Sequence, residues 1–280
     1  MKNILLTILI FFSSYVLSDT VQQNKLNAFY SAQDNKTESI ALLLHGTRGH
    51  KNLELISSLR ESLLDIGIDS LSINLSYGIA NRNNDFLPCD IHHQHTIKDS
   101  LDEIKLWYNF INKKGYTKFY LIGHSRGAVD ILNFYLHERD DLMNLDTIFL
   151  LAPIIDSDYN HKINYQKNHN IDLESINIEE DLKINFMGCE KALVSGETFK
   201  SYYYNPETKS LIEALKLSSI QTRVITGSED KITPNTHQVV HDLISEKKNI
   251  RLFQIDGSDH FFRDFYFDDL MEIISTEVEK

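Results

Sequence analysis

The segment Leu121–Gly127 constrains the fold most, because an apolar strand pattern over 118–122 runs directly into Gly-x-Ser-x-Gly and a helical pattern follows at once. A serine on so tight a strand-to-helix turn leaves almost no room beside the backbone. Only glycine fits two positions before and two positions after it, and these are Gly123 and Gly127. Such a turn holds the hydroxyl of Ser125 clear of the sheet. We therefore predict that Ser125 is a nucleophile.

A second buried-strand pattern ends in residues that suit the same chemistry. Ile40–Leu44 is followed by His45-Gly46-Thr47, and a glycine at a strand end lets the next backbone N–H turn toward the nucleophile. The helix that begins at Arg126 aims its free N–H groups and the positive end of its dipole at the same place. We predict that the backbone N–H groups of Thr47 and Arg126 form an oxyanion hole.

Two strand patterns downstream each lead to a polar side chain. The strand 222–226 leads to Asp230, which lies in the setting Gly-x-x-Asp-x-x-x-Pro, and the strand 251–255 leads to His260. Ser125, Asp230 and His260 therefore follow one another in that order along the chain.

Other carboxylates are alternatives to Asp230 as the partner of His260. Asp156 follows the strand pattern 147–151 and stays open as the acid, although we favour Asp230. Asp256 and Asp259 are too close to the histidine in sequence to reach round its ring, and we interpret them as turn formers.

Taken in order, Gly46, Ser125, Asp230 and His260 resemble the α/β-hydrolase superfamily in its compact esterase, lipase and aminopeptidase-like branch. The resemblance covers roughly residues 37–279. It implies an α/β fold with a mostly parallel, doubly wound sheet. It also implies that Ser125 is the nucleophile, His260 the general base and Asp230 the residue that orients the base. Neither a metal nor an organic cofactor is required.

The remaining periodicity agrees with alternating strands and helices from residue 39 to residue 279. Apolar residues spaced four and three apart predict a helix over 97–111, and 69–75 reads as a strand. The N-terminal stretch 21–38 offers only one strand, Leu26–Tyr30. We therefore predict a trimmed sheet of about six to seven strands.

Residues 156–216 interrupt this alternation, being rich in Asn, Lys, Glu and Tyr. The family commonly inserts a cap at this point, so we predict a cap that roofs the site and selects the substrate. The alternative is a long solvent-exposed loop without a function, but loops of this length are uncommon unless they are functional. Candidate lid contacts are Phe186, Met187, Tyr202, Tyr203 and Tyr204.

Three histidines, His92, His93 and His95, cluster in the loop after the strand 69–75. A zinc or copper site, contact with substrate, and packing at the start of the next helix are all open. We favour packing, because no carboxylate or cysteine stands at a compelling ligand spacing. His45 and His124 are interpreted as scaffold residues of their motifs.

The N-terminus has the pattern of a signal peptide, with Lys2 followed by an apolar run too short to span a bilayer. We expect cleavage after Ser18, which leaves a hydrolase domain over 19–280 in the periplasm or outside the cell. An uncleaved anchor is the alternative. The net charge of −12 argues against nucleic acid and anionic lipid as partners.

The only two cysteines of the chain are Cys89 and Cys189. In an exported protein a disulfide between them would persist. We predict that it ties the loop after the strand 69–75 to the cap. Free thiols or an intermolecular link are the alternatives.

These observations predict an exported serine hydrolase that cleaves a small acyl substrate, most simply a carboxylic ester, through an acyl-enzyme. An acyltransferase or peptidase with the same triad and a non-catalytic binding protein of the same fold are the alternatives. No residue distinguishes a lipid, an acetylated sugar or a peptide as the substrate, and none indicates the oligomeric state.

Overall fold

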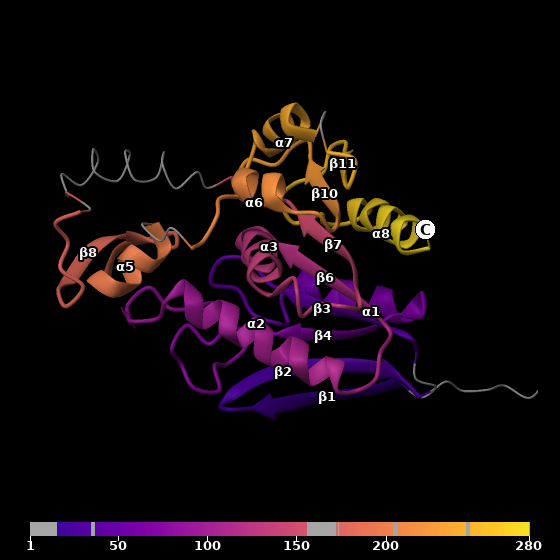
Figure 1. Cartoon of the computed structure of the whole chain (residues 1–280), viewed down its shortest axis with the longest axis horizontal. Coiled ribbons are helices and arrows are strands. Elements are labelled where there is room, and N and C mark those ends of the chain that lie inside the picture. Colours follow the sequence, from indigo (N-terminus) through magenta and orange to yellow (C-terminus); the bar gives the residue numbers. More distant parts are fainter. Residues whose placement is uncertain are drawn as a thin grey trace, which may run out of the picture.

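An eight-stranded sheet forms the centre of the molecule, with helices on both faces and a smaller three-stranded sheet at one side (Figure 1). The computed structural model describes residues 16–34, 37–155, 172, 174–203, 207–244 and 247–279. The strand order in the large sheet is β1-β2-β4-β3-β6-β7-β10-β11. The pairs β1–β2 and β2–β4 are antiparallel and all other neighbours are parallel. The predicted α/β architecture with a mostly parallel sheet is confirmed.

The strands of the large sheet are β1 (Val16–Gln23), β2 (Leu26–Gln33), β3 (Ser39–Leu44), β4 (Asp69–Ile73), β6 (Lys118–His124), β7 (Leu145–Leu151), β10 (Gln221–Gly227) and β11 (Ile250–Ile255). The strands of the small sheet are β5 (His92–His93), β8 (Asp181–Phe186) and β9 (Cys189–Ser195). The helices are α1 (Glu54–Asp65), α2 (Ile97–Asn112), α3 (Arg126–Glu138), α5 (Gly196–Tyr203), α6 (Leu211–Leu217), α7 (Thr236–Ile244) and α8 (Tyr266–Val278).

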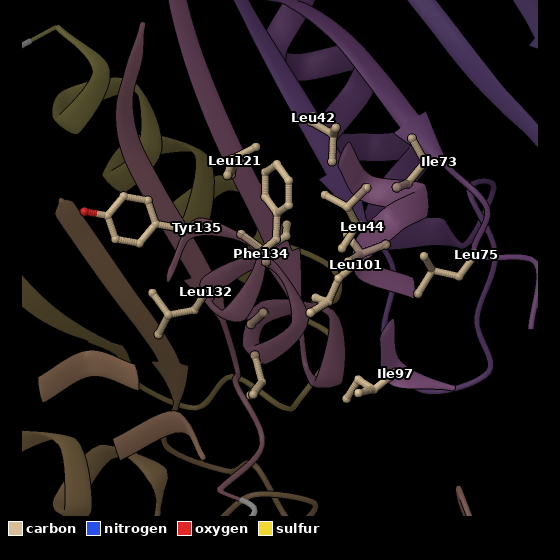
Figure 2. Close-up of a cluster of buried hydrophobic side chains, with 14 of the residues drawn as sticks. Leu42, Leu44, Ile73, Leu75, Ile97, Leu101, Leu121, Leu132, Phe134 and Tyr135 are labelled. Atoms are coloured by element: carbon tan, nitrogen blue, oxygen red, sulfur yellow. The ribbon is translucent and has the colours of Figure 1, made fainter. Parts of the chain in front are cut away.

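Alternate residues of the central strands point to opposite faces, and both faces are buried. Leu42, Leu44 and Leu121 belong to a core shared with α2, α3, α6 and α7, part of which is drawn in Figure 2. Leu43 and Ile122 belong to a second core shared with α1 and α8. Burial on both faces explains why these strands are continuous apolar runs.

The N-terminal strands correct one prediction. The expected six to seven strands, with Leu26–Tyr30 as the only one before β3, were wrong, because β1 pairs with β2 along its full length. The two strands meet at Asn24 and Lys25, whose φ angles of 49° and 65° give the left-handed turn that suits a two-residue hairpin. Polar residues of the edge strand β1 face solvent, so its sequence lacks an apolar alternation.

Most of the predicted signal peptide, residues 1–15, lies outside the described residues. Cleavage after Ser18 would remove the first three residues of β1 and leave Asp19–Gln23 paired with Leu26–Tyr30. Among the helices that the structure describes, none has the length and apolar character to cross a membrane.

The small sheet joins the histidine segment to the region predicted as a cap. β8 and β9 form an antiparallel pair, and β9 pairs in parallel with β5. α5 follows β9 and packs against α2, beside which it lies in Figure 1. α6, at the end of the predicted cap span, instead packs against α3, where Leu211 and Leu215 are fully buried.

A disulfide between Cys89 and Cys189 joins the loop after β4 to the start of β9, as predicted. The two Cα atoms lie 5.4 Å apart. The bond closes a segment whose ends are 100 residues apart in sequence. Closing so long a segment restricts the unfolded chain strongly.

Reduction of this disulfide is expected to lower the free energy of unfolding by about 2–4 kcal/mol, because the reduced unfolded chain gains conformational freedom. Amide hydrogens of β8 and β9 are expected to exchange faster at lower reductant concentrations than those of β6. Hydrogen exchange with mass spectrometry measures both. The double variant Cys89→Ala/Cys189→Ala should show no response to reductant. Two alkylatable thiols in native, unreduced protein would contradict the bond.

Candidate active site

Ser125 lies between β6 and α3, on a turn of unusual backbone geometry. Its φ of 55° and ψ of −119° lie where a non-glycine residue is rarely found. The amide N–H of Ser125 donates to the carbonyl oxygen of Leu151 at the end of β7, at 2.9 Å. The neighbouring strand therefore holds the strained turn in place.

Both glycines of the motif are required by close backbone contacts. A Cβ atom at Gly123 would lie 2.5 Å from the carbonyl oxygen of Gly127. One at Gly127 would lie 2.3 Å from the carbonyl oxygen of His45. Neither contact is sterically possible for another residue, so the elbow also fixes the distance between α3 and the end of β3.

The loop after β3 lies directly against the serine. A Cβ atom at Gly46 would be 3.0 Å from the Cβ of Ser125, so only glycine gives this loop a relaxed approach. Thr47 is the next residue. Arg126 is the first residue of α3, and N–H groups in the first turn of a helix have no acceptor within the helix. The segments of both predicted oxyanion donors therefore meet at Ser125, while their catalytic role stays a prediction.

Asp230 and His260 form a buried hydrogen-bonded pair beyond the ends of β10 and β11. His260 Nδ1 lies 2.7 Å from Asp230 Oδ2. The two loops meet because Gly227, the last residue of β10, has no side chain where the Ser258 carbonyl oxygen approaches; a Cβ there would be 2.3 Å away. The side chain of Asp230 is 2% exposed and that of His260 5%, so the pair is shielded from water.

Asp230 keeps its negative charge despite this burial. Burial alone would raise its pKa, but hydrogen bonds from His260 and Thr233 outweigh that effect and hold the pKa well below its usual range. Thr233 donates its hydroxyl at 2.6 Å, and the backbone N–H groups of Ile232 and Thr233 donate at 2.8 and 2.9 Å. A fully accepting carboxylate selects the tautomer in which His260 Nδ1 carries hydrogen and Nε2 is free to act as a base.

Two further histidines support the site as neutral scaffold groups. His124 donates from Nε2 to the carbonyl oxygen of His260 at 2.9 Å, and the two ring centroids are 4.8 Å apart. Because His124 precedes Ser125, this bond brings the backbone of His260 beside the elbow. His45 donates from Nδ1 to the Gly46 carbonyl at 2.8 Å. Burial lowers the pKa of His45 to about 3 and that of His124 to about 4.

Arg82 is a structural support that the sequence analysis missed. It lies in the polar loop after β4, is only 5% exposed, and donates to the carbonyl oxygens of Leu75 at 2.7 Å, Asp85 at 2.9 Å and Gly49. Its Nη2 lies 3.3 Å from His45 Nε2. Arg82 thus holds the loop that carries Thr47. Nothing in the local sequence marks it, since its partners come from separate segments.

Two of the three clustered histidines, His92 and His93, form strand β5 of the small sheet. His93 and His95 are buried, with 3.3 Å between His93 Nδ1 and His95 Nε2, and His95 Nδ1 lies 3.1 Å from the Tyr202 hydroxyl. His92 Nε2 lies 2.8 Å from Asp181 Oδ1 on β8. Within the described parts of the chain, no three His, Cys, Asp or Glu side chains group as a metal ion requires. These contacts tie β5 to β8 and tie His95 to α5.

The predicted lid contacts Phe186, Met187, Tyr202 and Tyr203 are all buried. Phe186 packs edge-on against Tyr202, with ring centroids 5.1 Å apart. Tyr204 and the alternative acid Asp156 lie outside the described residues.

Among known proteins, similarity to this chain is found in solved structures and not in sequences. No family model and no curated protein matches the sequence. Est1E from Butyrivibrio proteoclasticus is similar in structure, with a TM-score of 0.69 and 18% identity over 94% of this chain and 99% of that one. A second structure of Est1E, with ferulic acid bound, has a TM-score of 0.66 and 18% identity over 93% of this chain and 97% of that one. Alpha/beta hydrolase domain-containing protein 10 from mouse has a TM-score of 0.61 and 13% identity, covering 94% and 98%.

Replacing Arg82 with Met is expected to lower the free energy of unfolding by about 1–3 kcal/mol, because buried carbonyl oxygens lose their donor. Amide exchange should rise first in residues 45–51, the loop that Arg82 holds. Chemical denaturation and hydrogen exchange measure the two effects. Arg139→Met, at an exposed arginine at the end of α3, is the matched control. Unchanged exchange in residues 45–51 would contradict the supporting role.

Proposed function

We propose that this chain, which has the α/β-hydrolase fold, is a serine hydrolase that cleaves carboxylic esters through an acyl-enzyme. The observation that carries the proposal is the buried 2.7 Å hydrogen bond between His260 and Asp230, next to the strained elbow of Ser125. A paired, shielded imidazole near a serine on a strained strand-to-helix turn suits nucleophilic attack on a carbonyl carbon.

In the proposed mechanism His260 Nε2 takes the proton of the Ser125 hydroxyl as the oxygen attacks the ester carbonyl carbon. Asp230 stabilises the imidazolium that forms and holds its orientation. The N–H groups of Thr47 and Arg126 would bind the oxyanion. The bond between the carbonyl carbon and the alcohol oxygen then breaks, and His260 returns the proton to that oxygen. Water, activated by the same imidazole, releases the acid from Ser125.

Esters are proposed ahead of amides because an alkoxide leaves with little help, whereas an amine must be protonated in good geometry. The solved neighbours support hydrolysis: one is described as a hydrolase domain-containing protein, and another is a dienelactone hydrolase from Anabaena variabilis. Because Est1E binds ferulic acid, esters of aromatic acids belong among the substrates to be tested.

We propose that the protein acts in the periplasm or outside the cell. The apolar N-terminal run supports export, and so does the Cys89–Cys189 disulfide, since such bonds persist mainly in oxidising compartments.

Ser125→Ala is expected to lower kcat by roughly three or more orders of magnitude, because only the attacking hydroxyl is lost. Hydrolysis of p-nitrophenyl acetate and covalent labelling by a fluorophosphonate measure the effect, and circular dichroism checks the fold. Ser275→Ala, at a partly exposed serine on α8, is the control. Wild-type turnover or labelling in Ser125→Ala would refute the nucleophile.

Asp230→Asn is expected to reduce kcat by about 10³–10⁴-fold with little change in KM, because the amide favours the wrong tautomer of His260. Steady-state kinetics on the same ester separates the two constants. Asp156→Asn and Asp259→Asn are the controls and should retain most activity. A large loss in Asp156→Asn with an active Asp230→Asn would move the acid to the end of β7.

A further inference from the structure

Two histidines, His237 and His241, lie one helical turn apart on α7. The helix packs against β11, and neither histidine belongs to the proposed catalytic centre (Figure 1). The two imidazole rings are nearly parallel, with 26° between their planes and 6.5 Å between their centroids. Side chains four residues apart share one face of a helix, and two histidines at this spacing can chelate a metal ion.

A hydrogen bond to Thr226 fixes the ring of His237 and its tautomer. His237 Nδ1 lies 3.0 Å from the hydroxyl oxygen of Thr226, near the end of β10. That hydroxyl donates its single hydrogen to the carbonyl oxygen of Phe253, at 3.1 Å. It can therefore only accept from the histidine, so Nδ1 carries the hydrogen and Nε2 has the lone pair. Histidines that bind metal ions are oriented in this way by a partner of their second nitrogen.

His241 can complete the pair from the solvent side. Its Nδ1 lies 3.6 Å from Asp242 Oδ1, and a carboxylate on that side favours hydrogen on Nδ1 and the lone pair on Nε2. The side chain is 66% exposed, so it can rotate toward His237 and an ion can enter from water. Burial and the neighbouring His241 lower the pKa of His237, which keeps that imidazole neutral, the form that binds a cation.

The ligand set favours copper(II). Imidazole nitrogens bind Zn²⁺, Ni²⁺ and Cu²⁺, and for one set of ligands Cu²⁺ binds most tightly. Zinc sites in proteins use three or four protein ligands, whereas the described residues hold no group of three His, Cys, Asp or Glu side chains. Copper(II) accepts two nitrogens in a tetragonal arrangement whose other positions water fills. The only two cysteines form a disulfide, so no thiolate competes for the ion.

We propose that His237 and His241 form a binding site for Cu²⁺, in which the two Nε2 atoms occupy neighbouring positions on the ion and water occupies the others. The site does not depend on the proposed hydrolysis. A bound ion would join the first two turns of α7 to each other. Through the bond at Nδ1 of His237 it would also fasten α7 to Thr226 on β10.

Isothermal titration calorimetry of tag-free protein with CuCl₂ measures the affinity. His237→Asn keeps a donor for Thr226 in place of Nδ1 but has no Nε2, and His241→Asn removes the second nitrogen. Each variant is expected to bind Cu²⁺ about tenfold or more weakly than the wild type, because a single imidazole then binds without the chelate. Thr226→Val, which removes the group that orients His237, is expected to weaken binding about tenfold.

His137→Asn is the matched control, because His137 is an exposed histidine on α3 with no histidine one turn before or after it. It is expected to bind Cu²⁺ as the wild type does. Equal weakening in this control would contradict the site.

Electron paramagnetic resonance of the copper complex counts the nitrogen ligands. Hyperfine splitting from two nitrogens is expected in the wild type and from one nitrogen in each asparagine variant of α7. Unchanged affinity in His241→Asn would overturn the proposal, because the ion would then be bound elsewhere or by one ring alone. This variant decides the matter if His237→Asn does not fold, since the side chain of His241 is mostly exposed.

Discussion

The close approach of three backbone segments at Ser125 is the constraint on which the rest of the site depends. Gly123 and Gly127 let α3 cross the ends of β6 and β3 at contact distances that no Cβ atom allows. Strain at the serine is tolerated because the end of β7 holds its amide and two packed cores hold the strands. Glycine therefore stands where backbone segments approach most closely, and the backbone itself positions the hydroxyl of the proposed nucleophile.

Around that point the site is assembled from loops that hold one another. Asp230 fixes the ring of His260, and His124 ties the loop that carries His260 to the elbow. Arg82 fixes the loop that follows β3 through its bond to the Gly49 carbonyl oxygen. His45 and His124 are neutral because they are buried, so they act as hydrogen-bonding groups of fixed direction.

The elements that could be predicted are those whose signal is local. Buried parallel strands are continuous apolar runs, and the elbow requires glycines at fixed spacing, so β3, β6 and the candidate residues that follow strand ends were found. The hairpin of β1 and β2 was missed because an edge strand needs no apolar alternation and Asn24-Lys25 is a less familiar turn than Asn-Gly. Arg82 and the β5–β9 pairing depend on contacts between segments distant in sequence, for which a single chain offers no signal.

The disulfide also divides the chain topologically. The covalent ring that Cys89 and Cys189 close contains α2, β6, Ser125, α3 and β7, whereas Asp230 and His260 belong to the open arm that follows it. Apart from the backbone that continues from Cys189, only packing and hydrogen bonds hold the arm from β10 to α8 against the ring. The arm can therefore move away without breaking a covalent bond, which would separate the proposed base, His260, from the proposed nucleophile, Ser125, while the ring around the elbow stays closed.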